Sequence, residues 1–297
     1  MLSRKTPMDF TKYSLLRYKK RRAKMTDRIT VELFGSHKTL LLPLWARAKE
    51  SQKPNPLLND KRALDIINNL DYDFKNLEHH LDLFYQLSQV VRAKHFDDEV
   101  REFIKNNPLA TIINLGAGLD SSFERVDNGL IQWFDIDVPE VIDLRKKFIP
   151  ETERNHYISK SIFDKSWHSE IKKTNSSFLF IACGVIPYLK KSLVKNLFIS
   201  LSNSFPTSEL IFDSMSKMFR VLGNITVLTT TGMGSRAFMK WGINNAKNIE
   251  KWDPRIKVID EYQIFSCIEL NDMSHKDFIK IKNANKMKGL PMIHIKF

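Results

Sequence analysis

Residues 111–120 read Thr-Ile-Ile-Asn-Leu-Gly-Ala-Gly-Leu-Asp, and the chain changes character at this stretch. The first five residues form a short apolar run that is typical of a buried strand. Gly116-Ala117-Gly118 then predicts a tight turn, because glycine lacks a side chain and tolerates a positive φ. Ser121-Ser122 follows and can begin a helix. A strand, a glycine turn and a helix in this order predict a nucleotide-type binding site.

Further apolar runs follow this unit and alternate with helical stretches. We expect strands at 131–136, 156–162, 177–182, 209–213, 257–267 and 291–297, and helices at 138–148 and 193–201. Such alternation indicates a parallel sheet with helices on both faces. The sequence therefore predicts an α/β, Rossmann-like fold with a seven-stranded, mostly parallel sheet.

The chain before this region has helical periodicity and hardly any strand-like alternation. Leu64, Ile67 and Leu70 recur at helical spacing, and the same period continues over 90–104. Asn59-Asp60 can cap the helix that follows it. These patterns predict an N-terminal cap made of helices.

We therefore divide the chain into a helical cap over 1–107 and a core over 108–297. Within the core, the segment at about 214–253 is too long for a plain crossover. We expect it to fold over the sheet as a lid.

Composition excludes several classes of protein. With 297 residues, 42% of them apolar, the chain can fill a large core. No apolar run approaches the roughly 18 to 20 residues that cross a bilayer, so we expect a soluble, cytoplasmic protein. Cys183 and Cys267 lie in apolar stretches, and two cysteines cannot form a metal cluster, so we expect neither a disulfide nor a metal site.

The formal net charge of +13 raises the question of an acidic partner. Its densest basic cluster lies at 17–24, whereas the other Lys and Arg residues are scattered among acids. A solvated surface explains that scatter better than a nucleic-acid interface does. We therefore expect no nucleic-acid partner and no membrane contact.

An acidic pair, Asp135 and Asp137, ends the second predicted strand about 20 residues beyond the glycine turn, where a carboxylate can accept hydrogen bonds from ribose hydroxyls. The turn has no third glycine to bring a helix under a pyrophosphate, which favours a cofactor without phosphates over NAD. S-adenosylmethionine is such a cofactor. Arg92 lies in the helix before the first strand, and its guanidinium could pair with the cofactor's carboxylate.

Two motifs carry a family resemblance, namely residues 114–120 and the Trp-Phe-Asp-Ile-Asp-Val-Pro at 133–139. They resemble the leucine carboxyl methyltransferase family, and its bacterial branch of polyketide carboxyl methyltransferases in particular. The likeness extends to Thr-Leu-Leu-Leu-Pro-Leu-Trp-Ala-Arg-Ala at 39–48 and to Pro-Met-Ile-His at 291–294. The resemblance implies a class I methyltransferase that uses S-adenosylmethionine.

The resemblance also implies site residues. Arg92 would hold the cofactor's carboxylate, Gly116 would lie against its amino acid part, and Asp137 would take the ribose. Ser161-Ile162 falls on the adenine-contacting pair, where relatives often show Asp-Leu. Cys183 stands where the family places a cofactor-contacting glutamate, and a thiol supplies neither that charge nor two strong acceptor oxygens.

Transfer to a carboxylate needs no general base, because a carboxylate is already ionised at neutral pH. We therefore expect O-methylation of a small-molecule carboxylate or a peptide terminus, with Tyr188 a candidate to orient the substrate. Methylation of a phenol or alcohol, which a base would assist, stays open, as does a cofactor-binding relative without activity. Amino methylation of nucleic acid would require an Asn or Asp before Pro-Pro-aromatic, which Ile186-Pro187-Tyr188 lacks.

Overall fold

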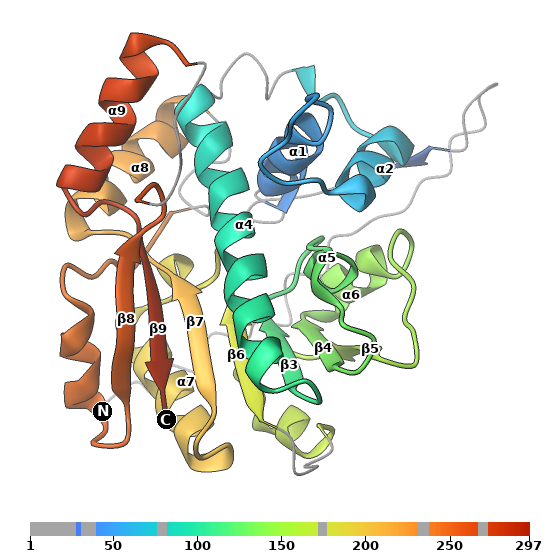
Figure 1. Ribbon diagram of the computed structural model, residues 1–297, viewed down its shortest axis with the longest axis vertical. Helices are drawn as coiled ribbons and strands as arrows, with labels where there is room; N and C mark the ends of the chain where they lie inside the picture. The colour runs from blue at the N-terminus through green and yellow to red at the C-terminus, as the bar shows by residue number, and fades with distance from the viewer. Residues whose placement is uncertain (1–27, 31–39, 76–81, 172–176, 231–237, 267–272) are drawn as a thin grey trace, which may run out of the picture.

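The computed structural model describes residues 28–30, 40–75, 82–171, 177–230, 238–266 and 273–297 (Figure 1). The basic cluster at 17–24 and Cys267 lie outside these residues. Within the described ranges, no helix has both the length and the hydropathy that crossing a membrane requires.

A seven-stranded sheet forms the centre of the described structure. Its strands are β3 (Thr111–Leu115), β4 (Gln132–Asp137), β5 (Asn155–Ser159), β6 (Phe178–Ala182), β7 (Glu209–Asp213), β8 (Lys257–Gln263) and β9 (Pro291–Lys296). They lie in the order β5-β4-β3-β6-β7-β9-β8. Only β9 runs antiparallel to its neighbours, β7 and β8. The predicted fold class is confirmed.

Helices cover both faces of this sheet (Figure 1). On one face, α4 (Leu83–Asn106), α5 (Ser122–Val126) and α9 (His275–Lys286) pack on side chains such as Ile112 and Ile181. On the other face, α7 (Lys191–Ser204) and the 3₁₀ helix η6 (Ala246–Trp252) pack on Ile113 and Leu115. Alternate residues of β3 thus enter opposite cores, which explains why the strand is apolar throughout.

Two strands end earlier than their sequence patterns suggested. We expected a strand over 156–162, but β5 ends at Ser159, since its neighbour β4 ends at Asp137 and the two residues are paired. The segment that follows forms a turn in which Asp164 donates its amide hydrogen to the carbonyl of Ser161. The strand expected over 257–267 ends at Gln263 as β8.

The N-terminal region contributes α1 (Leu41–Glu50), α2 (Lys61–Asn69) and a two-stranded parallel ladder of β1 (Ile29–Thr30) with β2 (Leu70–Asp71). Asp60 caps α2, as predicted, by accepting a hydrogen bond from the Ala63 amide. Unlike these elements, α4 packs directly on the sheet, so the cap boundary at residue 107 stays a prediction.

Apolar side chains join α1 and α2 to the core. Leu41, Leu44 and Ile66 form one buried cluster with Leu119 of the glycine turn and with Leu144. Leu144 belongs to α6 (Pro139–Arg145), the helix after β4. The N-terminal helices therefore rest on the segment that follows β3.

Candidate active site at the carboxyl edge of the sheet

The residues expected to form the site meet at one edge of the sheet. Strands β3 to β7 are parallel, so their carboxyl ends lie together, and ligands of open α/β sheets bind at that edge. Gly116 follows β3, Asp137 ends β4 and Cys183 follows β6. Ser161 and Ile162 follow β5, and Ile162 accepts a hydrogen bond from the Trp167 indole through its carbonyl oxygen.

The glycine turn requires glycine at Gly116 for two reasons. Its φ is +72°, in the left-handed region. A Cβ at this position would also lie only 2.6 Å from Cγ2 of Val185. The amide of Gly116 donates to the carbonyl of Ile136 over 2.8 Å, which anchors the turn to the end of β4.

The acidic pair separates into two different environments. Asp135 is fully buried and accepts hydrogen bonds from the Asn114 amide, the Trp133 indole and the Arg145 guanidinium at 3.0, 2.9 and 2.6 Å. All of its partners belong to the protein interior. Asp135 therefore serves to hold β3, β4 and α6 together.

Asp137 lies at the end of β4, next to the glycine turn. Its two oxygens accept backbone hydrogen bonds from Gly118 and Val138, both at 2.8 Å. Burial raises the pKa of Asp137 to about 6, against the opposing effect of these two amides and of Arg145. Its carboxylate is thus ionised at neutral pH and aligned by backbone donors.

Arg92 reaches the same edge from α4. Its Nη1 lies 3.2 Å from Oδ2 of Asp213, and its Nη2 donates to Oε1 of Gln89 over 2.7 Å. The other oxygen of Asp213 accepts a hydrogen bond from the Gly184 amide over 2.5 Å. Gly184 has a φ of +70°, and a Cβ there would lie 3.0 Å from Arg92. Asp213 therefore connects the arginine to the turn after β6.

Three groups that can release a proton interact electrostatically with Arg92, namely Tyr85, Cys183 and Tyr188. Burial raises the pKa of both phenols. It also raises the pKa of the Cys183 thiol, to about 12, although Arg92 opposes the shift. All three groups are protonated at neutral pH, so they offer hydrogen-bond donors rather than bases.

Our sequence reasoning missed Asp213, Gln89 and Gly184. Asp213 could have been found, because it is a carboxylate at the end of a buried strand, as Asp137 is. Gln89 lies one helical turn before Arg92, but nothing in the sequence sets it apart from other polar residues of α4.

Comparisons with known proteins identify the family of this chain. Residues 41–202 match the family described as leucine carboxyl methyltransferase. The tetracenomycin polyketide synthesis O-methyltransferase TcmP of Streptomyces glaucescens is 29% identical over 247 residues, which cover 82% of this chain and 88% of that protein. The S-adenosyl-L-methionine-dependent methyltransferase dpfgK of Gibberella zeae is 30% identical over 250 residues, 78% of this chain and 83% of that protein.

Among solved structures, that of a DUF574 family protein from Streptomyces avermitilis has a similar fold, with a TM-score of 0.53. It is 10% identical and covers 87% of this chain and 96% of its own. The family match extends over more than half of the chain, from α1 through most of α7. This chain belongs to the leucine carboxyl methyltransferase family.

Proposed function

We propose that this protein transfers the methyl group of S-adenosylmethionine to a carboxylate oxygen of a small molecule. As a member of this family it is an S-adenosylmethionine-dependent O-methyltransferase. The name of one relative, TcmP, assigns that protein to polyketide synthesis, which supports a polyketide-like acid as the substrate here. The choice of a carboxylate as the acceptor rests on the chemistry of the site.

The residues at the carboxyl edge fit this cofactor. Asp137 presents an aligned carboxylate next to the glycine turn, which suits the hydroxyls of a ribose. Arg92 has a buried Nε for which the described part of the chain offers no hydrogen-bond partner, and a carboxylate ligand would satisfy it. Gly116 lacks a side chain, so Val185 packs directly against the turn at this edge of the sheet.

In this proposal each residue has one role. Arg92 holds the cofactor's carboxylate, Gly116 lies against its amino acid part, and Asp137 accepts hydrogen bonds from the ribose. The remaining contacts come from the adenine-bordering pair and from the thiol after β6, namely Ser161, Ile162 and Cys183. When bound, the cofactor supplies an electrophilic methyl group.

A carboxylate acceptor suits the groups around Arg92. Tyr85, Tyr188 and Cys183 all have raised pKa values and stay protonated at neutral pH, so none of them can take a proton from a phenol or an alcohol. An ionised acid needs no base, and Tyr188 can orient it by donating a hydrogen bond. The buried, partnerless Nε of Arg92 is the observation that carries the cofactor site, and the lack of a base among these three groups favours the carboxylate as acceptor.

We further propose that residues 1–107 cap the site and that 214–253 form its lid. The described part of the lid supports this role, because the amides of Lys240 and Trp241 donate to the carbonyl of Pro187 over 2.7 and 3.0 Å. Pro187 precedes Tyr188 in the 3₁₀ helix η4 (Ile186–Tyr188). A lid attached there can exclude water from the acceptor.

The test is methyl transfer to a panel of aromatic and polyketide-like acids, each matched with the phenol and the amide of the same skeleton. Label from S-adenosylmethionine should appear as a base-labile methyl ester of an acid, and Tyr188→Phe should raise KM for that acid. Transfer to the phenols alone would instead establish the hydroxyl acceptor. Cofactor binding without transfer to any member of the panel would favour a binding protein, for which Cys183 is the candidate cause.

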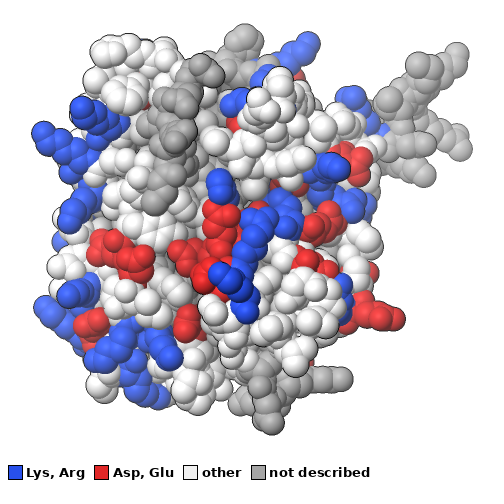
Figure 2. Space-filling model, viewed as in Figure 1, with Lys and Arg blue, Asp and Glu red and all other residues white. Residues whose placement is uncertain are grey.

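The described residues on the face shown in Figure 2 give no support to a nucleic-acid substrate. On the face in Figure 2, acidic and basic side chains lie side by side instead of forming one basic surface. On α4, for example, Asp98 binds both Lys94 and Arg101. Charges neutralised in this way do not make the continuous basic track that a phosphate backbone requires.

A further inference from the structure

The segment at 39–48, which the sequence analysis singled out, has no part in the proposed cofactor contacts. It ends in α1, whose Arg47 is buried, with 5% of its surface exposed. Nε of Arg47 donates to Oδ2 of Asp60 over 2.7 Å, and its Nη2 donates to the carbonyl of Leu119 over 3.1 Å. A single side chain of the N-terminal helices thus binds the backbone of the glycine turn.

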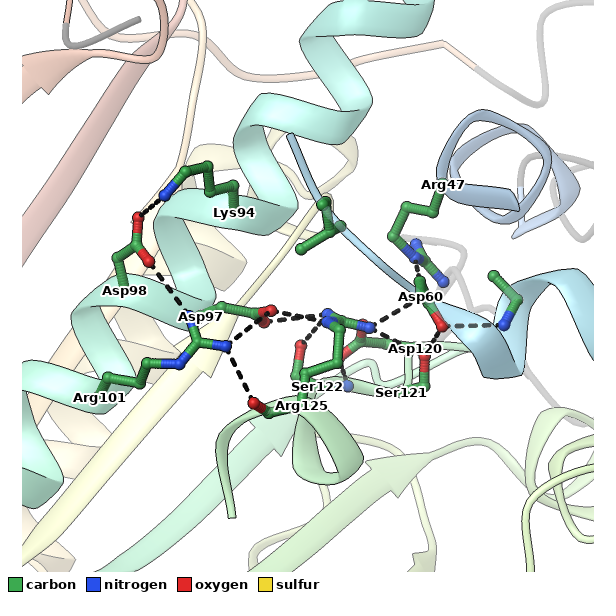
Figure 3. A network of polar contacts seen from close by, with 12 residues as sticks. Arg47, Asp60, Lys94, Asp97, Asp98, Arg101, Asp120, Ser121, Ser122 and Arg125 are labelled. Carbon is green, nitrogen blue, oxygen red and sulfur yellow. Dashed lines mark hydrogen bonds and ion pairs between the residues drawn. The ribbon is translucent and has the colours of Figure 1, made fainter. Parts of the chain in front are cut away.

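Asp60 extends this contact into a buried network (Figure 3). Its carboxylate also accepts hydrogen bonds from Arg125 and Ser121 at 2.8 and 2.7 Å. Arg125 in turn makes a bidentate pair with Asp97 of α4, at 2.6 and 2.9 Å. Burial alone would raise the pKa of Asp60, but the arginines and the hydrogen bonds hold it at about 2. Asp60 therefore stays charged throughout the physiological range.

Two arginines bind carbonyl oxygens of the turn, and a third arginine binds a side chain there. Besides Arg47 on Leu119, Nη1 of Arg145 donates to the carbonyls of Gly118 and Asp120 at 3.2 and 2.5 Å. Arg125 binds the Asp120 side chain at 3.4 Å. The amide of Gly118 is the group that donates to Asp137, so the path of the turn sets the position of that carboxylate.

Packing reinforces the hydrogen bonds. The side chain of Leu119 is buried in the cluster that α1 and α2 form. Leu40, directly before α1, lies so close to Gly118 that a Cβ there would be 3.0 Å from it. The N-terminal helices thus cover the Leu119 side chain and bind its carbonyl, while α6 binds the carbonyls on either side of it.

We propose that Arg47 and Asp60 are positioning residues of the cofactor site, through which α1 and α2 fix the glycine turn and thereby Asp137. The proposal rests on the proposed function. A buried ionic network of this kind fixes one arrangement more than it adds stability, because desolvation offsets much of the attraction between its charges. Docking of the N-terminal helices and binding of the cofactor are therefore coupled.

Arg47→Lys tests this coupling, with Arg62→Lys as the matched control. Lysine keeps a positive charge beside Asp60 but cannot span two acceptors as the planar guanidinium does. Arg62 also joins α2 to α5, through Glu124 at 2.9 Å, and it binds the carbonyl of Phe148, without touching the glycine turn. Calorimetric titration with S-adenosylmethionine should show roughly tenfold weaker binding for Arg47→Lys. The control should stay within about twofold of the wild type.

Equal affinities of the two variants would overturn the proposal while leaving the proposed function intact, whereas a wild type that binds no cofactor would contradict the proposed function itself. If Arg47→Lys fails to fold, hydrogen exchange of the wild type tests the coupling instead. Coupling is reciprocal, so saturating cofactor should slow amide exchange in α1 and α2. Unchanged exchange in both helices, with slowed exchange at the glycine turn, would refute the coupling.

Discussion

Replacing Gly116 by alanine perturbs the point where the backbone of the turn meets Val185. The positive φ of +72° costs an L-residue about 1–2 kcal/mol. Overlap of the new Cβ with Cγ2 of Val185 at 2.6 Å costs about 1–3 kcal/mol more. Alanine also lowers the conformational entropy of the unfolded chain, which offsets the loss by about 0.4–1 kcal/mol. The expected loss of unfolding free energy is therefore about 1–5 kcal/mol, and cofactor affinity should fall as well.

Urea unfolding, followed by tryptophan fluorescence, measures this loss. Gly129→Ala is the matched control, because Gly129 has a φ of +83° with no atom near its would-be Cβ, so only the backbone cost remains. In a Val185→Ala background, Gly116→Ala should cost about 1–3 kcal/mol less than in the wild type, since the overlap is relieved. Equal costs in the two backgrounds would refute the steric explanation.

Three further predictions concern charged residues. Asp213→Asn removes the charge that holds Arg92 and should raise the Kd for S-adenosylmethionine roughly tenfold; an unchanged Kd in calorimetry would contradict this role. Asp135→Ala leaves Arg145 buried without its carboxylate partner and should lower the unfolding free energy by about 3–5 kcal/mol in urea titrations; a loss below about 1 kcal/mol would contradict the structural role. The pKa of Asp60 is about 2 in the folded protein, against an ordinary value of 3.8, so its charged form stabilises the fold above about pH 4. About 2 kcal/mol of unfolding free energy should therefore be lost as the pH falls through 2. Acid unfolding of Asp60→Asn should lack this component.

The sheet and its glycine turn could be predicted because their signals are local. Thr111–Leu115 is an apolar run followed directly by Gly116, and β7 was expected at the same residues that it occupies, Glu209–Asp213. Strand ends were less predictable, since β5 stops where its partner β4 stops and not where its own apolar pattern does. Pairing between strands decides such boundaries.

The buried network around Asp60 could not be predicted. Arg47, Asp60, Asp97 and Arg125 lie far apart in the sequence, and each could serve as an ordinary surface charge. Only the fold brings them together in the interior, where burial forces each to find a partner. The choice of Asp137 over Asp135 came from the family resemblance, and the interior partners of Asp135 now give it a physical reason.

The most direct test of the account is calorimetric titration of the protein with S-adenosylmethionine between pH 7.5 and 5, for the wild type and for Asp137→Asn. The account predicts saturable binding at pH 7.5 that weakens as the pH falls through about 6, because protonation of Asp137 removes the charged acceptor for the ribose hydroxyls. Asp137→Asn should bind more weakly at pH 7.5 and show no such pH dependence. Absence of binding by the wild type, or binding that is the same in Asp137→Asn at every pH, would contradict the central claim.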